Sequence, residues 1–252
     1  MKLAIVTGVS KGLGASVAEL FLKSNIPLIG TSRTENNELK QIAGDNNTAY
    51  EHLSVDLRQE KELENLAEAL GEKLAHFQPT IVYLVNNAAM VKPVHQASNI
   101  NPKELSNHIN LNLTAPVILT NSLLAQASGQ DAILVALTVT SGAAENPIYG
   151  WSAYCSTKAG MNMYTKTVAL EQEELNTGHK IIAFNPGIMD TNMQANIREH
   201  THEEFIDIDR FKSYKENQLL RQPREVAEVL YKIIIKEEKI QNGYIYTVDE
   251  YL

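Results

Sequence analysis

Two side chains near the middle of the chain have the types and spacing of an acid–base pair. Tyr154 and Lys158 are four residues apart, so in a helix they lie one turn apart on the same face. A phenol ordinarily titrates near pH ~10, and a neighbouring ammonium group lowers that pKa by favouring the phenolate. A tyrosine adjusted in this way can give a proton to an alkoxide or take one from an alcohol.

Ser141 lies upstream of this pair, just after the apolar run at 132–139, which is typical of a buried strand. In an open parallel sheet, ligands bind at the carboxyl ends of the strands. The serine is therefore expected at the edge of the sheet where a substrate would lie. A Tyr-x-x-x-Lys pair alone is common on amphipathic helices, so the interpretation depends on the elements around it.

Composition and charge narrow the class of protein. The chain has 252 residues, of which 44% are hydrophobic, and this suits a single α/β domain. The net charge of −8 argues against a nucleic-acid partner, because such proteins usually carry a basic face. The single cysteine, Cys155, favours a reducing compartment. With no signal-peptide layout and no apolar run of membrane-spanning length, we expect a cytoplasmic protein with no membrane partner.

A glycine-rich turn follows the first predicted strand, at 3–7. Residues 8–14 lead from that strand into a helical pattern at 15–22. Glycines let a backbone approach a pyrophosphate, and a helix N-terminus offers free N–H groups, so this layout predicts a phosphate-binding site. Gly8-x-Ser10-x-Gly12 also matches the nucleophile elbow of hydrolases. That alternative needs a late histidine, and the last one, His202, lies in a charged segment.

The residues after the second predicted strand, at 26–31, bear on the choice of cofactor. This strand ends in Ser32-Arg33, where an acidic residue would bind a ribose 2′-hydroxyl and an arginine accommodates a 2′-phosphate. Lys11 in the glycine turn adds a second positive charge. The pattern predicts NADP(H), while Glu35, two residues beyond Arg33, leaves NAD open.

The rest of the chain alternates between strand and helix patterns. Strands are predicted at 50–55, 81–85, 180–185 and 243–248. Helices are predicted at 60–77 and at 102–127, the second with a bend at Pro116. The helix that carries Tyr154 and Lys158 is predicted to continue to Glu174, and a last helix begins at Pro223. The alternation predicts one α/β domain over residues 1–252, a Rossmann-type, doubly wound parallel sheet with helices on both faces. The polar segment 188–222 is too long for a plain connection and is predicted to be a substrate lid.

Taken in order, these motifs resemble the short-chain dehydrogenase/reductase family over nearly the whole chain. Asn112, Ser141, Tyr154 and Lys158 fall in that family's catalytic order. Three further stretches are similar to its cofactor turn, its Asn-Asn-Ala-Gly element and its nicotinamide-side motif: Thr7-Gly8-x-x-x-Gly12-x-Gly14, Asn86-Asn87-Ala88-Ala89, and Pro186-Gly187 with Thr191. Ala89 departs from the family's glycine.

The resemblance implies a role for each of the four residues. Tyr154 would be the general acid, and Lys158 would lower its pKa and hold the nicotinamide ribose. Ser141 would polarise the substrate carbonyl, and Asn112 would hold a water that links Lys158 to solvent. Two donors aimed at the oxygen suit the charge that hydride transfer leaves there. The implied NADP(H) contacts are Gly8, Ser10, Lys11, Gly12, Leu13, Gly14, Arg33, Asp56, Leu57, Asn87, Ala88, Tyr154, Lys158, Pro186, Gly187, Ile188 and Thr191; no metal is expected.

A narrower resemblance points to a substrate class. The stretches at 149–158, 185–194 and 249–252 are similar to bacterial benzil reductases, relatives of sepiapterin reductase that reduce vicinal dicarbonyls with NADPH. This implies an NADPH-dependent carbonyl reductase of a small ketone or an aromatic 1,2-diketone. The expected substrate contacts are Ser141, Tyr149, Trp151, Met189 and Met193, with Phe184 as a further aromatic neighbour.

Other functions stay open at this point. A reductase of this family could instead act on a pterin, a ketosteroid or a 3-oxoacyl thioester. A non-catalytic NADP-binding sensor would carry damage at the serine, tyrosine or lysine, and all three are intact. The resemblance leaves both a homodimer and a homotetramer open as the assembly.

Overall fold

Seven parallel strands form the centre of the molecule. The computed structural model describes residues 1–252, and its sheet has the order β3-β2-β1-β4-β5-β6-β7. The order reverses at β1, which pairs with both β2 and β4. The predicted doubly wound α/β fold is therefore confirmed. The strands are β1 (Lys2–Thr7), β2 (Leu28–Ser32), β3 (Tyr50–Ser54), β4 (Ile81–Asn86), β5 (Ile133–Val139), β6 (Lys180–Asn185) and β7 (Ile245–Thr247).

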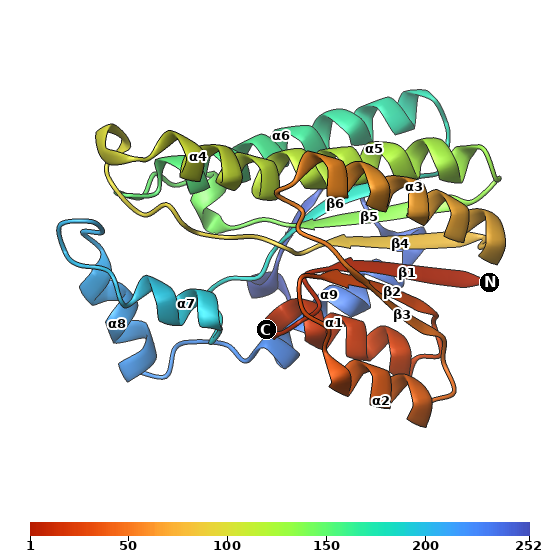
Figure 1. Ribbon diagram of the computed structural model, residues 1–252, viewed down its shortest axis with the longest axis horizontal. Coiled ribbons are helices and arrows are strands. Elements are labelled where there is room, and N and C mark those ends of the chain that lie inside the picture. The colour runs from red at the N-terminus through yellow and green to blue at the C-terminus, as the bar shows by residue number, and fades with distance from the viewer.

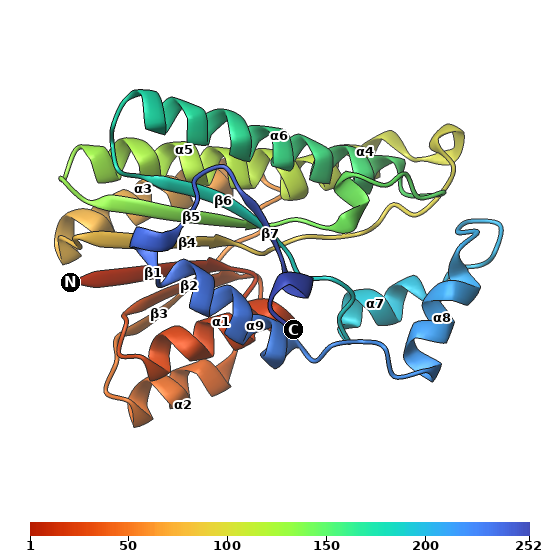
Figure 2. The same ribbon diagram turned by 180° about the vertical axis from the view of Figure 1, so that it is seen from behind.

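Helices cover both faces of this sheet (Figures 1 and 2). Helices α1, α2 and α9 pack on one face, and α3, α5 and α6 pack on the other. None of the helices combines the length and the apolar character needed to cross a membrane. Their bounds are α1 (Gly12–Lys23), α2 (Asn37–Asp45), α3 (Glu60–Phe77), α4 (Pro102–Ile109), α5 (Ala115–Ser128), α6 (Ser152–Glu174), α7 (Asn192–Ile197), α8 (Ile208–Glu216) and α9 (Pro223–Ile234).

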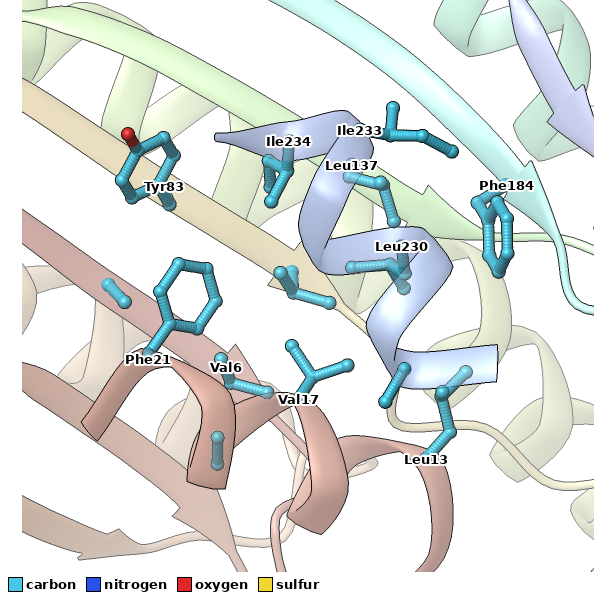
Figure 3. Packing of buried hydrophobic residues seen from close by; sticks show 14 of the residues in the cluster. Val6, Leu13, Val17, Phe21, Tyr83, Leu137, Phe184, Leu230, Ile233 and Ile234 are labelled. Carbon is cyan, nitrogen blue, oxygen red and sulfur yellow. The ribbon is translucent and has the colours of Figure 1, made fainter. Parts of the chain in front are cut away.

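The strands are almost continuously apolar because helices cover both faces of the sheet. Successive side chains of a strand point to opposite faces. In β1, Ala4 and Val6 belong to the core on the side of α1 and α9, whereas Leu3 and Ile5 belong to the core on the other side. Figure 3 shows how residues of α1 and α9 interleave over the strands.

The long helix predicted at 102–127 is divided in the structure. A π-helical turn, Asn110–Thr114, separates α4 from α5. A proline has no N–H, and its ring clashes with the carbonyl of the residue four positions earlier, which for Pro116 is Asn112. The wider turn ends at Thr114, two residues before Pro116, and accommodates both effects. The sequence predicted a bend at Pro116 itself, whereas the irregular part of the helix lies before this proline.

Helix α2 was not predicted, because most of its residues are polar. It begins after Asn36, whose side chain accepts a hydrogen bond from the N–H of Glu38 at 3.0 Å. Only Leu39 and Ala43 are buried, four residues apart, so the helix contacts the core along a narrow stripe. A stripe of this width carries little signal in the sequence.

The segment at 188–222 contains α7 and α8 and lies beyond the carboxyl ends of the strands (Figures 1 and 2). Its two ends are joined at the base. Met189 and Arg221 form a short parallel bridge, in which Asp190 N donates to the Arg221 carbonyl at 2.9 Å. An ion pair of 2.6 Å between Lys215 and Asp190 adds to this connection.

Candidate active site

The turn between β1 and α1 has the backbone shape of a phosphate cradle. Gly8 and Gly12 have φ values of 77° and 61°, in the left-handed region that favours glycine. A Cβ at Gly8 would stand 2.8 Å from the side-chain nitrogen Nδ2 of Asn87. At the start of α1, Lys11 is extended and no side chain caps the helix. The first N–H groups of α1 therefore remain available to an anionic ligand.

Asn87 ties β4 to β1 beneath this turn. Its Nδ2 donates to the carbonyls of Thr7 and Gly8 at 3.0 and 3.3 Å. The Thr7 hydroxyl in turn accepts from the N–H groups of Asn87 and Ala88, each at 3.0 Å. Gly14 was expected to contact the cofactor, but it lies behind the turn. A Cβ there would collide with the Gly8 carbonyl and the Asn87 amide, so this glycine permits close packing instead.

Positive side chains follow the ends of β1, β2 and β3. Arg33 and Lys11 are exposed in the cavity wall and take part in none of the protein's ion pairs. Arg58 also lines the wall, although the sequence reasoning missed it. Its guanidinium holds both carboxylate oxygens of Asp56, with Nε donating to Oδ1 at 2.9 Å and Nη2 donating to Oδ2 at 2.5 Å. The hydrogen bonds from Arg58 lower the pKa of Asp56.

Ser141, Tyr154 and Lys158 come together at the carboxyl end of β5. Ser141 follows this strand, and its Oγ accepts from the N–H of Ala143 at 3.2 Å. Tyr154 and Lys158 lie near the start of α6 and are only 7% and 3% exposed. The Lys158 ammonium lies 5.6 Å from the centroid of the Tyr154 ring and donates to the Val139 carbonyl at 2.7 Å. The two side chains are thus one turn apart, as their spacing predicts.

The protonation of this pair differs from the expectation. Burial raises the pKa of Tyr154 to about 12, while the Ser141 side chain acts in the opposite direction. Burial also lowers the pKa of Lys158 to about 8. Loss of hydration disfavours the charged form of each group, and it is the main cause of both shifts. The Tyr154 phenol is therefore protonated at neutral pH, which is the state that a proton donor requires.

Asn112 lies in the π-helical turn and is 2% exposed. Its Oδ1 accepts from the N–H of Met90 at 2.9 Å, and its Nδ2 donates to the Met90 carbonyl at 2.7 Å. The buried amide thus has the partners that its position requires. A small cavity of about 10 Å³ lies between Asn112 and Lys158. A polar cavity of this size holds about one water molecule.

One large cavity, with a volume of about 1100 Å³, connects the cradle to these residues. The glycine backbone along the cavity, the uncapped helix and the unpaired cations fit an anionic dinucleotide. Every expected NADP(H) contact except Gly14 lines this cavity: Gly8, Ser10, Lys11, Gly12, Leu13, Arg33, Asp56, Leu57, Asn87, Ala88, Tyr154, Lys158, Pro186, Gly187, Ile188 and Thr191.

Aromatic and apolar side chains form the wall of the cavity next to Tyr154. Trp151 meets the rings of Tyr154 and Phe211 edge-on, with centroids 5.2 and 5.4 Å apart. Met189 and Met193 also line this wall, as expected from the sequence. Phe211 was missed, as were Val91, Ile148 and Tyr214, which line the cavity as well. The three-residue spacing of Phe211 and Tyr214 on a helix was the available signal.

Two aromatic residues expected near the substrate lie elsewhere. Tyr149 is 44% exposed, and its hydroxyl accepts a hydrogen bond from the Gln96 amide at 2.6 Å. The chain turns at Gly150, with φ of 80°, so Tyr149 lies outside the cavity while Trp151 lines it. Phe184 is fully buried in the core beside Leu230 and Ile233 of α9 (Figure 3). The assignment of Tyr149 to the substrate site is therefore corrected.

Two further reactive side chains, Cys155 and His200, have partners within the protein. Cys155 is partly buried, with its Sγ 3.8 Å from the Asn146 carbonyl. His200 pairs with Glu204 at 3.3 Å. No group of three or more His, Cys, Asp or Glu side chains is placed to hold a metal ion.

The chain belongs to the short-chain dehydrogenase family, whose model, described as "short chain dehydrogenase", matches residues 2–202. It is 37% identical to a benzil reductase ((S)-benzoin forming) of Bacillus subtilis (strain 168) over 252 residues, which is 100% of both chains. A benzil reductase ((S)-benzoin forming) of Bacillus cereus is 35% identical over 99% of this chain and 100% of its own. A solved short-chain dehydrogenase/reductase of Saccharomyces cerevisiae is 27% identical, with a TM-score of 0.82 over 98% of this chain and 96% of that one.

Proposed function

We propose that this protein is an NADPH-dependent carbonyl reductase that acts on an aromatic 1,2-diketone. The observation that carries the proposal is the position of two donors, Ser141 and Tyr154, in the wall of a cavity that also contains a dinucleotide cradle. The two Bacillus benzil reductases, similar over the full length of the chain, support the same reaction class.

The choice of NADP(H) is supported by charge. The cations of Arg33 and Lys11 face the cavity and lack an acidic partner in the protein, so they can pair with a 2′-phosphate. The uncapped start of α1 would hold the pyrophosphate. When bound, the cofactor supplies the hydride.

Each catalytic side chain then has one task. Tyr154 gives its phenolic proton to the carbonyl oxygen as the carbonyl carbon receives the hydride, so one C=O becomes a CH–OH. Ser141 donates a hydrogen bond to the same oxygen and stabilises its developing charge. Lys158, held by the Val139 carbonyl at 2.7 Å, carries the positive charge that favours proton loss from the phenol.

A proton must then return to Tyr154 from solvent. The small cavity between Asn112 and Lys158 has room for about one water on that route. The side-chain amide of Asn112 is occupied by Met90, so the main-chain carbonyl is the group left to hold such a water. Pro116 has no N–H for the α-helical hydrogen bond to that carbonyl.

The substrate class is supported by the wall beside Tyr154. Trp151, Phe211 and Met193 offer an apolar, aromatic surface, which favours aryl rings through burial and ring contacts. We also propose that the segment at 188–222 covers the bound substrate as a lid, because Met189, Met193 and Phe211 all come from it.

The test is the ratio of kcat/KM for a benzil-like diketone to kcat/KM for an acetoacetyl thioester at one NADPH concentration. The proposal predicts a ratio above one, with a hydroxyketone as the product of the diketone. A ratio below one would overturn the proposed substrate class but would not contradict the proposal that the protein is a carbonyl reductase. If the protein oxidised NADPH with none of the four substrate classes, namely diketones, pterins, ketosteroids and thioesters, the proposal that it is an enzyme would be overturned.

A further inference from the structure

A buried histidine lies directly behind the catalytic residues. His108, in the last turn of α4, is 0% exposed, and its ring meets the Tyr154 ring edge-on with centroids 6.1 Å apart. Its Nδ1 lies 2.7 Å from the Lys92 carbonyl. Its Nε2 lies 3.0 Å from Asn112 Nδ2 and 3.1 Å from the Thr157 hydroxyl. No step of the reaction above uses this imidazole.

Its partners determine where the imidazole proton resides. A carbonyl oxygen can only accept, so the nitrogen that faces Lys92 must carry the hydrogen. The orientation of the Asn112 amide is fixed separately, because the N–H of Met90 requires Oδ1 and the carbonyl of Met90 requires Nδ2. Asn112 therefore presents N–H to His108 Nε2, which must accept. Both arguments give the same neutral form, with hydrogen on Nδ1.

We propose that His108 is a positioning residue, which holds Asn112 and the segment at 90–94 in fixed relation to Tyr154. The segment forms part of the cavity wall through Met90 and Val91. Val91 also belongs to the same apolar cluster as Trp151. The kinetic side of this inference rests on the proposed function, whereas its structural side can be measured in the protein alone.

The neutral imidazole joins three parts of the site. It bonds the main chain of the 90–94 segment at Lys92 and the π-helical turn at Asn112. Its Nε2 also lies 3.1 Å from the hydroxyl of Thr157 in α6, three residues after Tyr154. Without the acceptor at Nε2, one N–H of the buried Asn112 amide loses its partner. The amide can then leave Met90 to find another, which releases both the wall and the neighbourhood of Lys158.

Two substitutions at His108 test the hydrogen bonds of its two ring nitrogens one at a time. His108→Gln keeps an oxygen within reach of the Nε2 position, so Asn112 retains its acceptor. His108→Asn keeps an N–H near the Nδ1 position, so it retains only the bond to Lys92. A matched control is His179→Asn, because His179 is also buried, at 3% exposure, and accepts from Leu134 N through Nδ1. His179 lies near the start of β5 and does not line the cavity.

The experiment combines hydrogen exchange at the Met90 amide with kcat and KM for NADPH-dependent diketone reduction. We expect His108→Asn to speed Met90 exchange and to lower kcat by roughly tenfold or more, with little change in KM. His108→Gln and His179→Asn should leave both quantities near those of the wild type. If His108→Asn does not fold, the test is hydrogen exchange at the Met90 amide in His108→Gln. Protection equal to that of the wild type supports the proposal, and loss of protection contradicts it.

Two results would overturn the inference. One is unchanged Met90 protection in His108→Asn, and the other is equal losses in the Asn and Gln variants, which would mean that any change at this position only disturbs packing. Absence of turnover in the wild type would contradict the proposed function alone, because exchange at Met90 still decides the role of His108.

Discussion

The Trp151 indole is stacked on the Phe205 ring, with centroids 5.1 Å apart and planes only 8° from parallel. Trp151 directly precedes α6, the helix that carries Tyr154, and Phe205 lies between α7 and α8. The preceding residue, Gly150, lies so close to the 188–222 segment that a Cβ there would collide with the Glu204 carbonyl. This contact fixes the 188–222 segment to the start of the catalytic helix.

Replacing Trp151 by alanine should therefore destabilise the protein strongly. Loss of a buried large aromatic side chain costs about 3–5 kcal/mol of unfolding free energy. Equilibrium urea denaturation measures this, with Tyr149→Phe as the matched control. That exposed neighbour should change stability by less than about 0.5 kcal/mol. Similar losses for the two variants would show that the Trp151 stack is not the anchor of the segment.

Removing the charge of Arg33 should affect the affinity for NADPH and not the affinity for NADH. Arg33→Ala should weaken NADPH binding by roughly ten- to a hundred-fold, because one charge-assisted contact is worth about 1.5–3 kcal/mol. NADH lacks the 2′-phosphate and serves as the internal control, with affinity almost unchanged. Fluorescence titration of both cofactors against both proteins is the measurement. Equal weakening for NADH and NADPH would remove Arg33 from phosphate recognition.

The fold could be predicted from the sequence because its signals are local. The buried strands are short apolar runs, and α3 begins and ends at the residues predicted for it, Glu60 and Phe77. Likewise the spacing of Tyr154 and Lys158 is enough to place them on one helix face. Helix α2 was missed because only Leu39 and Ala43 of its residues are buried.

Other parts of the site depend on contacts between distant segments. Arg58 and His108 belong to no motif, and each acquires its position only when other elements fold against it. Tyr149 and Trp151 are both aromatic and lie two residues apart, so the sequence gives no reason to place them differently. The left-handed turn at Gly150 directs only Trp151 into the cavity wall. The pKa of Tyr154 could not be predicted from its neighbour alone either, because burial of the phenol dominates.

A methyl group at Gly14 should damage the cofactor site. The added Cβ of Gly14→Ala would meet the Gly8 carbonyl and the Asn87 amide, and the turn must shift to admit it. We expect NADPH affinity to fall by at least about tenfold. Gly44→Ala in α2 is the control, since its added Cβ would point into open space. The control should bind NADPH normally and raise stability by as much as about 1 kcal/mol. Normal affinity in Gly14→Ala would contradict this role.

Burial of Lys158 should make stability depend on pH. Its pKa is lowered from 10.5 to about 8 in the folded protein, so between these values the unfolded chain binds more protons. The contribution of Lys158 to stability therefore increases as pH rises through this window. We expect wild type to gain stability relative to Lys158→Met between about pH 8 and about pH 10.5. Lys166→Met, on the exposed side of α6, should show no such change. A difference that stays constant with pH would contradict the buried charge.

The central claim is that the Tyr154 hydroxyl is the proton donor, and Tyr154→Phe tests it most directly. Phenylalanine keeps the ring contacts with Trp151 and His108 and removes only the hydroxyl. The measurement is kcat for NADPH-dependent diketone reduction, together with the Kd for NADPH. The account predicts that kcat falls by about 10²- to 10⁴-fold while Kd stays almost unchanged. Retention of more than about a tenth of the wild-type kcat would contradict it.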